Sequence, residues 1–323
     1  MARKSRAPAK IQKAIRQLQY SIPSGVSYVD IFKDLSMVNR KLFKQGHVLG
    51  IESVEFVYTA DPAQYPVTRL QAFTAGDSWS VHNAHVKSKA LWDEMNQLVL
   101  EDNPSIQAKW HDFKVYLDDA MATATILNPK DGAGADVVAG EWSYSRFVLP
   151  EHEVDPVTGL PLPADETFAH LVGPDVLDPV TGEYISVGMV QAYADSRAQV
   201  FDNAPNVPGA FSESFFQQLT DTGSQEPELG DVLEASNDDP PYPVFRYVGG
   251  KDNAEMPMLT EFAVATEGYP TATLAPFMAQ CGLIKFENQS FQGGAQVAGP
   301  AITAIVTVMA GKYKGVAAKP MGQ

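Results

Sequence analysis

Six histidines and one cysteine are the main candidates for metal binding or nucleophilic catalysis in this chain. Only His82 and His85 lie close together, and their spacing lacks both the third ligand and the general-base Glu of a zinc protease motif. Cys281 has apolar neighbours and no adjacent base, so we interpret it as a core residue that forms no disulfide within the chain. The sequence therefore predicts no metal site and no cofactor.

Acidic side chains are numerous, and pairs such as Glu151 with Glu153 are the groups that a glycosidase uses. With 39 acids in the chain, however, such pairs also arise by chance. The sequence contains no phosphate-cradling glycine loop, nucleophile elbow or dinucleotide fingerprint. We therefore expect no catalytic residue and no enzymatic activity, with a β-sandwich carbohydrate-active enzyme as a minor alternative.

The ends of the chain carry the strongest signal for a partner. Met1–Tyr20 has six basic residues and no acid, although the net charge of the whole chain is −15. Asn288–Gln323 also lacks acids and carries Lys312, Lys314 and Lys319. Basic ends on an acidic body indicate binding to phosphates or to an anionic membrane surface. The predicted nucleic-acid-binding residues are those of the N-terminal arm: Arg3, Lys4, Arg6, Lys10, Lys13 and Arg16.

Apolar residues recur at helical spacing between Ile11 and Leu18, which predicts a short amphipathic helix over residues 8–20. Such a helix is too short to be stable alone. It would order against a polyanion, a membrane surface or a neighbouring subunit, or else remain a solvated tail. The four tryptophans lie in strand or helix patterns and are interpreted as core residues, so contacts with nucleic acid are expected at phosphates rather than bases.

The body behind the arm is predicted to consist mainly of strands, because short β-type runs alternate with turns rich in proline and glycine. Helices are predicted over residues 28–44 and 84–100, the second with Asn83 as its N-cap. The eight strand-like runs lie at residues 48–59, 67–74, 112–118, 141–149, 184–193, 244–265 taken as one broken unit, 283–287 and 301–312.

Three regions follow from this pattern: a basic arm over 1–25, a body over 26–314 with an exposed excursion at 202–243, and a loose basic tail over 315–323. The pentapeptide Asp-Pro-Val-Thr-Gly occurs at 155–159 and at 178–182, and each copy is predicted to form an exposed turn. The sequence shows neither a secretory signal nor an apolar run long enough to span a bilayer, so we expect synthesis in a cytosol.

Eight antiparallel strands with elaborated connections and a basic N-terminal arm resemble the jelly-roll capsid proteins of small icosahedral viruses with single-stranded DNA genomes. The resemblance lies in the organisation of the whole chain, and it rests on no diagnostic sequence motif. It implies an all-β fold, an eight-stranded antiparallel jelly-roll sandwich. It also implies self-assembly of many copies into the shell of a virion, in the host cytoplasm or nucleus, with packaged nucleic acid bound by the arm without sequence preference.

Two other virion components remain open. The first is a compact double jelly-roll shell protein of a phage with an internal membrane, in which residues 28–149 and 184–312 each close as a sandwich and the arm lies on anionic lipid. The second is a β-rich tail or adhesin module whose loop at 202–243 binds a host receptor.

Overall fold

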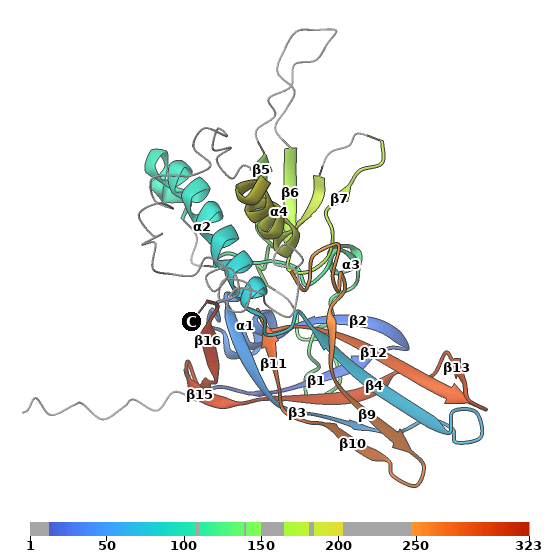
Figure 1. The fold of residues 1–323 in the computed structure, drawn as a ribbon. Helices are drawn as coiled ribbons and strands as arrows, with labels where there is room; N and C mark the ends of the chain where they lie inside the picture. Colours follow the sequence, from blue (N-terminus) through green and yellow to red (C-terminus); the bar gives the residue numbers. More distant parts are fainter. Residues whose placement is uncertain are drawn as a thin grey trace, which may run out of the picture.

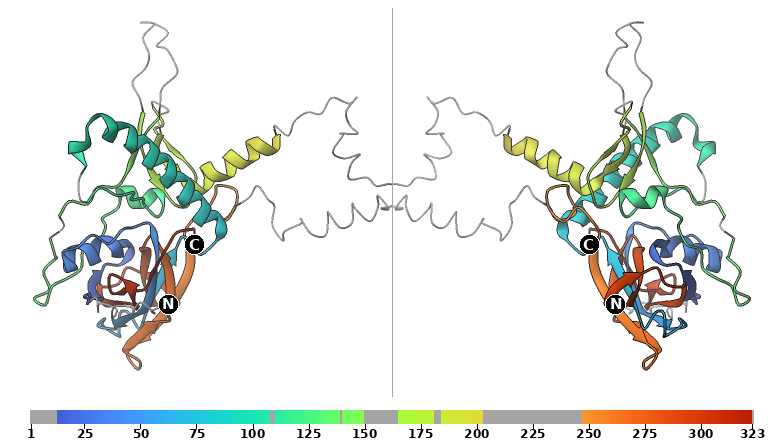
Figure 2. Two further views of the ribbon diagram at one scale, coloured as in Figure 1. Left: turned by 90° about the vertical axis from the view of Figure 1, so that its left-hand side faces the viewer. Right: turned by 90° about the vertical axis from the view of Figure 1, so that its right-hand side faces the viewer.

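The computed structural model describes residues 13–107, 110–138, 140–149, 165–180, 184–202 and 247–322. In these residues β-sheet predominates, and two antiparallel sheets form a sandwich (Figure 1). A group of helices and a third sheet lie to one side of the sandwich, and the two further views in Figure 2 show the same separation. The sandwich is built from the first and last parts of the chain, and the described residues between Thr74 and Met258 form the second part.

One long strand organises the first sheet. β3 (His47–Val57) pairs along one edge with β14 and β16, and along its other edge with β10 and β11. β1 pairs with the far edge of β14, and every pairing is antiparallel. The other strands of this sheet are β1 (Gln17–Ile22), β10 (Thr271–Leu274), β11 (Phe277–Gln280), β14 (Ile302–Val308) and β16 (Ala318–Pro320).

The second sheet is centred on β12 (Leu283–Gln292), which pairs with β2 and β13 along one edge and with β4 along the other. β9 pairs with the far edge of β4. The other strands of this sheet are β2 (Gly25–Asp30), β4 (Val67–Thr74), β9 (Met258–Thr266) and β13 (Ala295–Val297).

The sandwich core follows from strict alternation along these strands. In β1 the residues Leu18, Tyr20 and Ile22 are buried while their neighbours are exposed, and β14 has the same alternation. Phe56 from the first sheet and Phe286 from the second are fully buried in one apolar cluster. Burying each such side chain contributes about 1.5–3 kcal/mol, so this shared core holds the two sheets together.

The second part of the molecule has its own core, centred on Trp92 and Phe113. Its longest helix begins at Ser78, whose hydroxyl accepts a hydrogen bond from the Val81 amide. The helices here are α2 (Trp79–Asp102), the 3-10 turn η1 (Pro104–Ile106), α3 (Asp119–Thr123) and α4 (Met189–Asp202). The third sheet contains β5 (Arg146–Leu149), β6 (Asp165–His170), β7 (Val176–Leu177) and β8 (Tyr184–Gly188).

A buried carboxylate joins the two parts. Asp30 ends β2 and caps α1 (Ile31–Asn39), because its Oδ1 accepts from the Lys33 amide at 3.0 Å. Its Oδ2 accepts from Gln45 Nε2 at 3.0 Å, and from Trp142 Nε1 and the Tyr144 hydroxyl at 3.1 Å each. Since Asp30 is fully buried, these four donors replace the water that the carboxylate loses on folding.

Several predicted elements are confirmed. The run at 67–74 is β4, and the run at 48–59 matches β3 to within two residues. The run at 283–287 is the first half of β12. The helix predicted over 84–100 lies within α2, although its N-cap is Ser78 rather than Asn83.

Other boundaries are wrong because tertiary packing overrides local pattern. The run at 112–118 is buried on both faces and makes only an isolated bridge, between Tyr116 and His170, so it is no strand. The run at 184–193 ends as a strand at Gly188, where α4 begins, and the helix at 28–44 shortens to α1 because β2 takes its first residues. The remaining predicted runs are longer than the strands that they contain. Within the described residues, the run at 141–149 contains β5 and the run at 244–265 contains β9. The run at 301–312 is divided into β14 and β15 (Ala310–Tyr313).

The arm and the tail are less separate than expected. The helix predicted over 8–20 is wrong in its described part, because residues from Gln17 onward form β1 and the alternation of Leu18, Tyr20 and Ile22 decides the structure. The tail is not loose either, since β16 pairs with β3 and Met321 is buried.

The excursion at 202–243 lies almost wholly outside the described residues, as does the first Asp-Pro-Val-Thr-Gly copy. The start of the second copy forms the expected exposed turn, with Val180 90% exposed and its amide bonded to the Asp178 carboxylate. The arrangement in which 28–149 and 184–312 close as separate sandwiches is wrong, because each sandwich sheet contains strands from both ranges.

Asp30→Ala is expected to destabilise the protein by about 3 kcal/mol, because the helix loses its cap and three buried donors lose their acceptor. Urea unfolding measures this change. Asp93→Ala on the exposed surface of α2 is the control and should change the free energy of unfolding by less than about 0.5 kcal/mol. Equal effects of the two substitutions would contradict this role for Asp30.

The buried carboxyl of Asp34 predicts that the stability of the folded protein depends on pH. Its carboxyl is fully buried, one oxygen accepts from the Tyr20 hydroxyl, and the other has no hydrogen-bond partner among the described residues. Burial raises the pKa of Asp34 well above its usual value. The folded state therefore holds this proton more tightly than the unfolded state, so the contribution to stability is present at low pH and is lost as the pH rises through the raised pKa.

Asp34→Asn should remove that part of the pH dependence and make the protein more stable than wild type at pH 8, since the amide stays neutral at every pH. Urea unfolding from pH 5 to pH 8 tests this expectation. Parallel curves for the variant and the wild type would contradict a raised pKa of Asp34 in the folded state.

Candidate nucleic-acid interface

The described chain enters the sandwich beside the end of β14. Arg16 precedes β1, and its Nη1 donates to the carbonyl oxygen of Val308 at 2.7 Å and to Glu52 Oε2 at 3.3 Å. The Val308 amide in turn donates to the Arg16 carbonyl at 2.9 Å. These bonds fix the point from which the preceding residues, with Arg3, Lys4, Arg6 and Lys10, must start.

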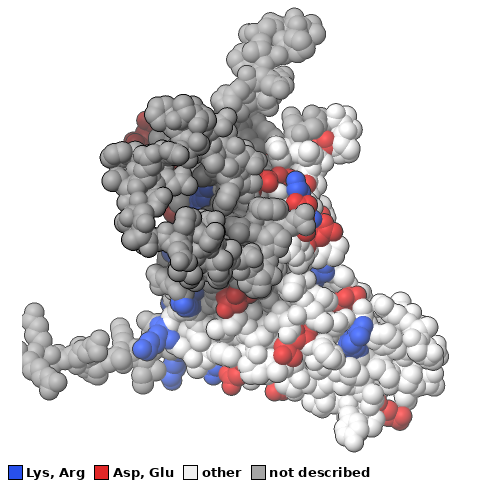
Figure 3. Space-filling model, in the orientation of Figure 1, with Lys and Arg blue, Asp and Glu red and all other residues white. Residues whose placement is uncertain are grey.

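Cations from three segments meet at this point, and we call them the basic cluster. Lys41 Nζ donates to the carbonyl of Lys13 at 3.2 Å and to that of Lys314 at 3.1 Å. Lys314 Nζ donates to the Leu42 carbonyl. We define the basic cluster as Lys13, Arg16, Lys41, Lys44 and Lys314, together with Arg40, which precedes Lys41 in the chain. Figure 3 shows lysine and arginine side chains gathered at the end of the sandwich where β15 and β16 lie in Figure 1.

Aromatic rings pack against the residues of the basic cluster. Tyr313 stacks on His47 with ring centroids 4.3 Å apart and meets Phe43 edge-on at 6.1 Å. Its hydroxyl accepts a hydrogen bond from the Lys44 amide at 2.9 Å. Lys41 Nζ lies 5.3 Å from the centroid of the Phe43 ring, within the range of a cation–π interaction. The rings thus hold the loop after α1 against the hairpin after β15.

The charges in the cluster are only partly compensated. Two acids contact it: Glu52 pairs with Arg16, and Asp112 pairs with Lys44 at 3.3 Å. Six cations and two acids leave the site strongly positive. Burial lowers the pKa of Lys314, and the neighbouring charges of Lys44 and Lys41 lower it further. A bound anion would relieve this repulsion, so the site favours phosphate or another polyanion.

Two of the cations occupy unusual backbone positions. Arg40 has φ = 53° and Lys314 has φ = 52°, both in the left-handed region where glycine is the usual residue. Arg40 is exposed, and its guanidinium makes no hydrogen bond or ion pair with any described residue. Arg40 takes this conformation as the C-cap that ends α1, and its exposed guanidinium remains accessible to a ligand.

The predicted site residues divide into two groups. Lys13 and Arg16 belong to the basic cluster, whereas Arg3, Lys4, Arg6 and Lys10 lie outside the described residues. The basic C-terminal stretch, predicted as a separate end, contributes Lys314. The sequence analysis missed Arg40, Lys41 and Lys44, for which the signal was a basic run in the turn after α1.

Comparison of the chain with known proteins assigns it to no family. No family model, no curated protein and no solved structure matches the chain. Within the described residues, no three His, Cys, Asp or Glu side chains are grouped so that they could hold a metal ion. No helix among those residues is long and apolar enough to cross a membrane.

Arg40→Gly should weaken binding to single-stranded DNA without loss of fold, because glycine adopts the left-handed conformation without strain. Removing one phosphate contact should reduce the slope of log K against log salt concentration by about 0.7. Titrations of an oligonucleotide at several salt concentrations measure this slope, and thermal unfolding checks the fold. Lys89→Ala, which removes an exposed cation on α2, is the control and should leave the slope unchanged.

Proposed function

We propose that this chain is a viral capsid protein with a jelly-roll shell domain, which assembles into a closed icosahedral shell. In this proposal the basic cluster and the residues before it bind packaged nucleic acid through its phosphates. The body of the chain supplies the contacts between copies. The observation that carries the proposal is the order of the strands in the two sandwich sheets.

That order supports a jelly roll once interrupted strands are counted together. β10 and β11 follow the same edge of β3, and β16 continues the line of β14. If the three-residue strand β13 at the end of β12 is set aside, counting along the chain gives eight strands, in the order 1-8-3-6 in one sheet and 2-7-4-5 in the other. First pairs with eighth, second with seventh, third with sixth and fourth with fifth, all antiparallel. A long hairpin rolled into two sheets has this pairing, and it is the arrangement of capsid jelly rolls.

The long connection between the fourth and fifth strands fits the same proposal. It contains α2, α4 and the third sheet, all on one side of the sandwich (Figure 1). Connections of a rigid sandwich tolerate large insertions because they do not disturb the packed sheets. The eight strands can therefore keep their packed structure, while the residues inserted between the fourth and fifth strands supply a second surface.

Nucleic acid is favoured over a membrane as the partner of the basic end. The lipid alternative depended on an amphipathic helix over residues 8–20, and residues 17–20 of that range belong to β1 instead. What remains is a cluster of cations on an acidic chain, which is the usual footprint of phosphate binding. Since the cluster includes no groove-reading element, the binding is expected to be independent of sequence.

Purified protein is expected to form closed shells visible by negative-stain electron microscopy, because the proposal requires contacts between many copies. Deleting residues 2–12 should leave shells that contain less nucleic acid, measured as the ratio of absorbance at 260 and 280 nm. Deleting residues 2–22 should prevent folding, because β1 contributes Leu18, Tyr20 and Ile22 to the core. A protein that stays monomeric over a range of pH and salt would refute the capsid proposal.

A further inference from the structure

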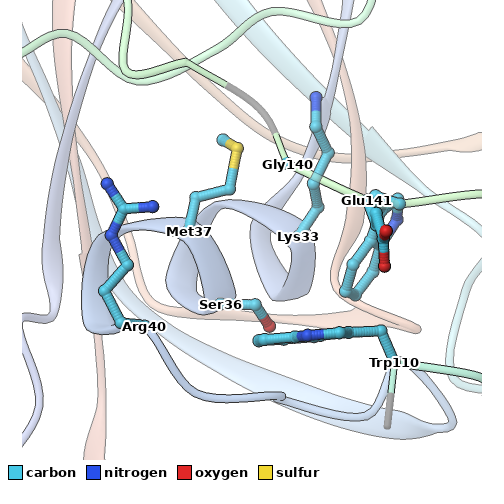
Figure 4. A pocket seen from close by; sticks show the side chains of 8 residues that line it. Lys33, Ser36, Met37, Arg40, Trp110, Gly140 and Glu141 are labelled. Atoms are coloured by element: carbon cyan, nitrogen blue, oxygen red, sulfur yellow. The ribbon is translucent and has the colours of Figure 1, made fainter. Parts of the chain in front are cut away.

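A cavity lies beside the basic cluster, against the outer side of α1. Its volume is about 210 Å³, which is smaller than the roughly 300–1,000 Å³ of pockets for drug-sized ligands. Figure 4 shows Lys33, Met37 and Arg40 projecting from the helix, Glu141 across from them, and the indole of Trp110 beneath Ser36. The lining is completed by Gly140 and Trp142. The cavity therefore has room for one flat ring with a polar group at its edge.

Two indoles, those of Trp110 and Trp142, form walls of this cavity. The Trp110 ring makes no ring or cation–π contact with any described residue, although its backbone carbonyl accepts from Lys114 Nζ at 2.7 Å. Trp142 is held firmly, because its Nε1 donates to the buried carboxylate of Asp30 and Lys114 Nζ lies 4.8 Å from its ring centroid. A partly exposed indole beside a fixed one is a surface on which a planar ligand can stack.

The charges at the rim give such a ligand an orientation. Arg40 lines the cavity and also belongs to the basic cluster, so a phosphate bound there lies at the cavity rim. Lys33 Nζ is already bonded to Asn128 Oδ1 at 2.9 Å, whereas the guanidinium of Arg40 makes no hydrogen bond or ion pair with another residue in the described part of the chain. The Glu141 carboxylate repels phosphate and accepts hydrogen bonds from amino groups. A ligand with one ring and one phosphate therefore enters ring first.

We propose that this cavity binds one nucleobase of a single-stranded nucleic acid, stacked on Trp110, with the adjoining phosphate on Arg40. The inference rests on the proposed function, in which the basic cluster binds phosphates. It adds contact with a base, which the sequence analysis did not expect from the tryptophans. Stacking on an aromatic ring tolerates any base, so this contact also fits binding without sequence preference.

The test compares two fluorescently labelled decamers, one of deoxythymidine and one of abasic sites with the same backbone charge. Fluorescence anisotropy with the full chain should show about tenfold tighter binding of the deoxythymidine decamer, because only it can stack. Trp110→Ala should remove this preference, and Trp110→Phe should retain most of it. Both substitutions should leave the affinity for the abasic decamer unchanged.

A second variant keeps the test independent of the loss of Trp110 packing. A Cβ atom added at Gly140 meets no heavy atom within 4 Å, so Gly140→Leu is expected to fold and to fill the cavity. It should abolish the preference for the deoxythymidine decamer. Gly132→Leu is the matched control, since that position is also open and lies outside the cavity lining. It should preserve the preference.

The outcomes separate the two proposals. Equal affinity of wild type for both decamers overturns the base-binding cavity and leaves phosphate binding by the basic cluster intact. A preference that survives both Trp110→Ala and Gly140→Leu places base contact elsewhere and also overturns the inference. Failure of wild type to bind either decamer at low salt overturns both the cavity and the nucleic-acid role of the cluster.

Discussion

The buried carboxylate of Asp30 is the constraint on which the rest of the structure depends. It lies at the junction of β2 and α1, and it accepts hydrogen bonds from the helix, from Gln45 and from two aromatic residues of the inserted part. Burial raises its pKa, and the donors oppose that shift. A carboxylate in this position is tolerated only if every donor is present, so it fixes the inserted part against the sandwich. The same bonds orient Trp142 at the cavity and place α1, from which Arg40 follows.

A second constraint is topological. Because β1 pairs with β14, the first and last strands of the sandwich are neighbours, and the two basic ends of the sequence are brought to one place. Lys41 lies where the two ends meet, because its Nζ donates hydrogen bonds to the carbonyls of both Lys13 and Lys314. The cations of the two ends and of the turn after α1 therefore lie in one cluster, and in the proposed function they would bind phosphates together. The pairing of β1 with β14 thus brings cations that are far apart in the sequence to one place on the surface.

Much of the fold could be predicted from the sequence, in the places where local pattern and packing agree. β3, β4 and α2 bury one face against a core, so their alternation or helical stripe is visible in the residues. The segment 112–118 has the same alternation and misled the prediction, because its charged residues are buried too: Asp112 pairs with Lys44, and Asp118 accepts from Tyr28 and Lys285. Those partners are distant in sequence. Arg40 and the cavity were missed for the same reason, since only the tertiary structure brings α1 beside Trp110.

The distribution of charge on the chain determines how a subunit would be oriented toward nucleic acid in the proposed function. The chain as a whole is strongly acidic, so most of its surface repels phosphate, and the basic cluster is a local exception. Burial lowers the pKa of Lys314, and the charges of Lys44 and Lys41 lower it further, so an anion bound at the cluster would reduce the repulsion between these cations. Binding of nucleic acid would therefore stabilise the folded subunit in the same step that orients it with its basic end toward the polyanion. In the proposed shell this orientation would point each cluster inward, and assembly would then be coupled to the presence of a strand to package.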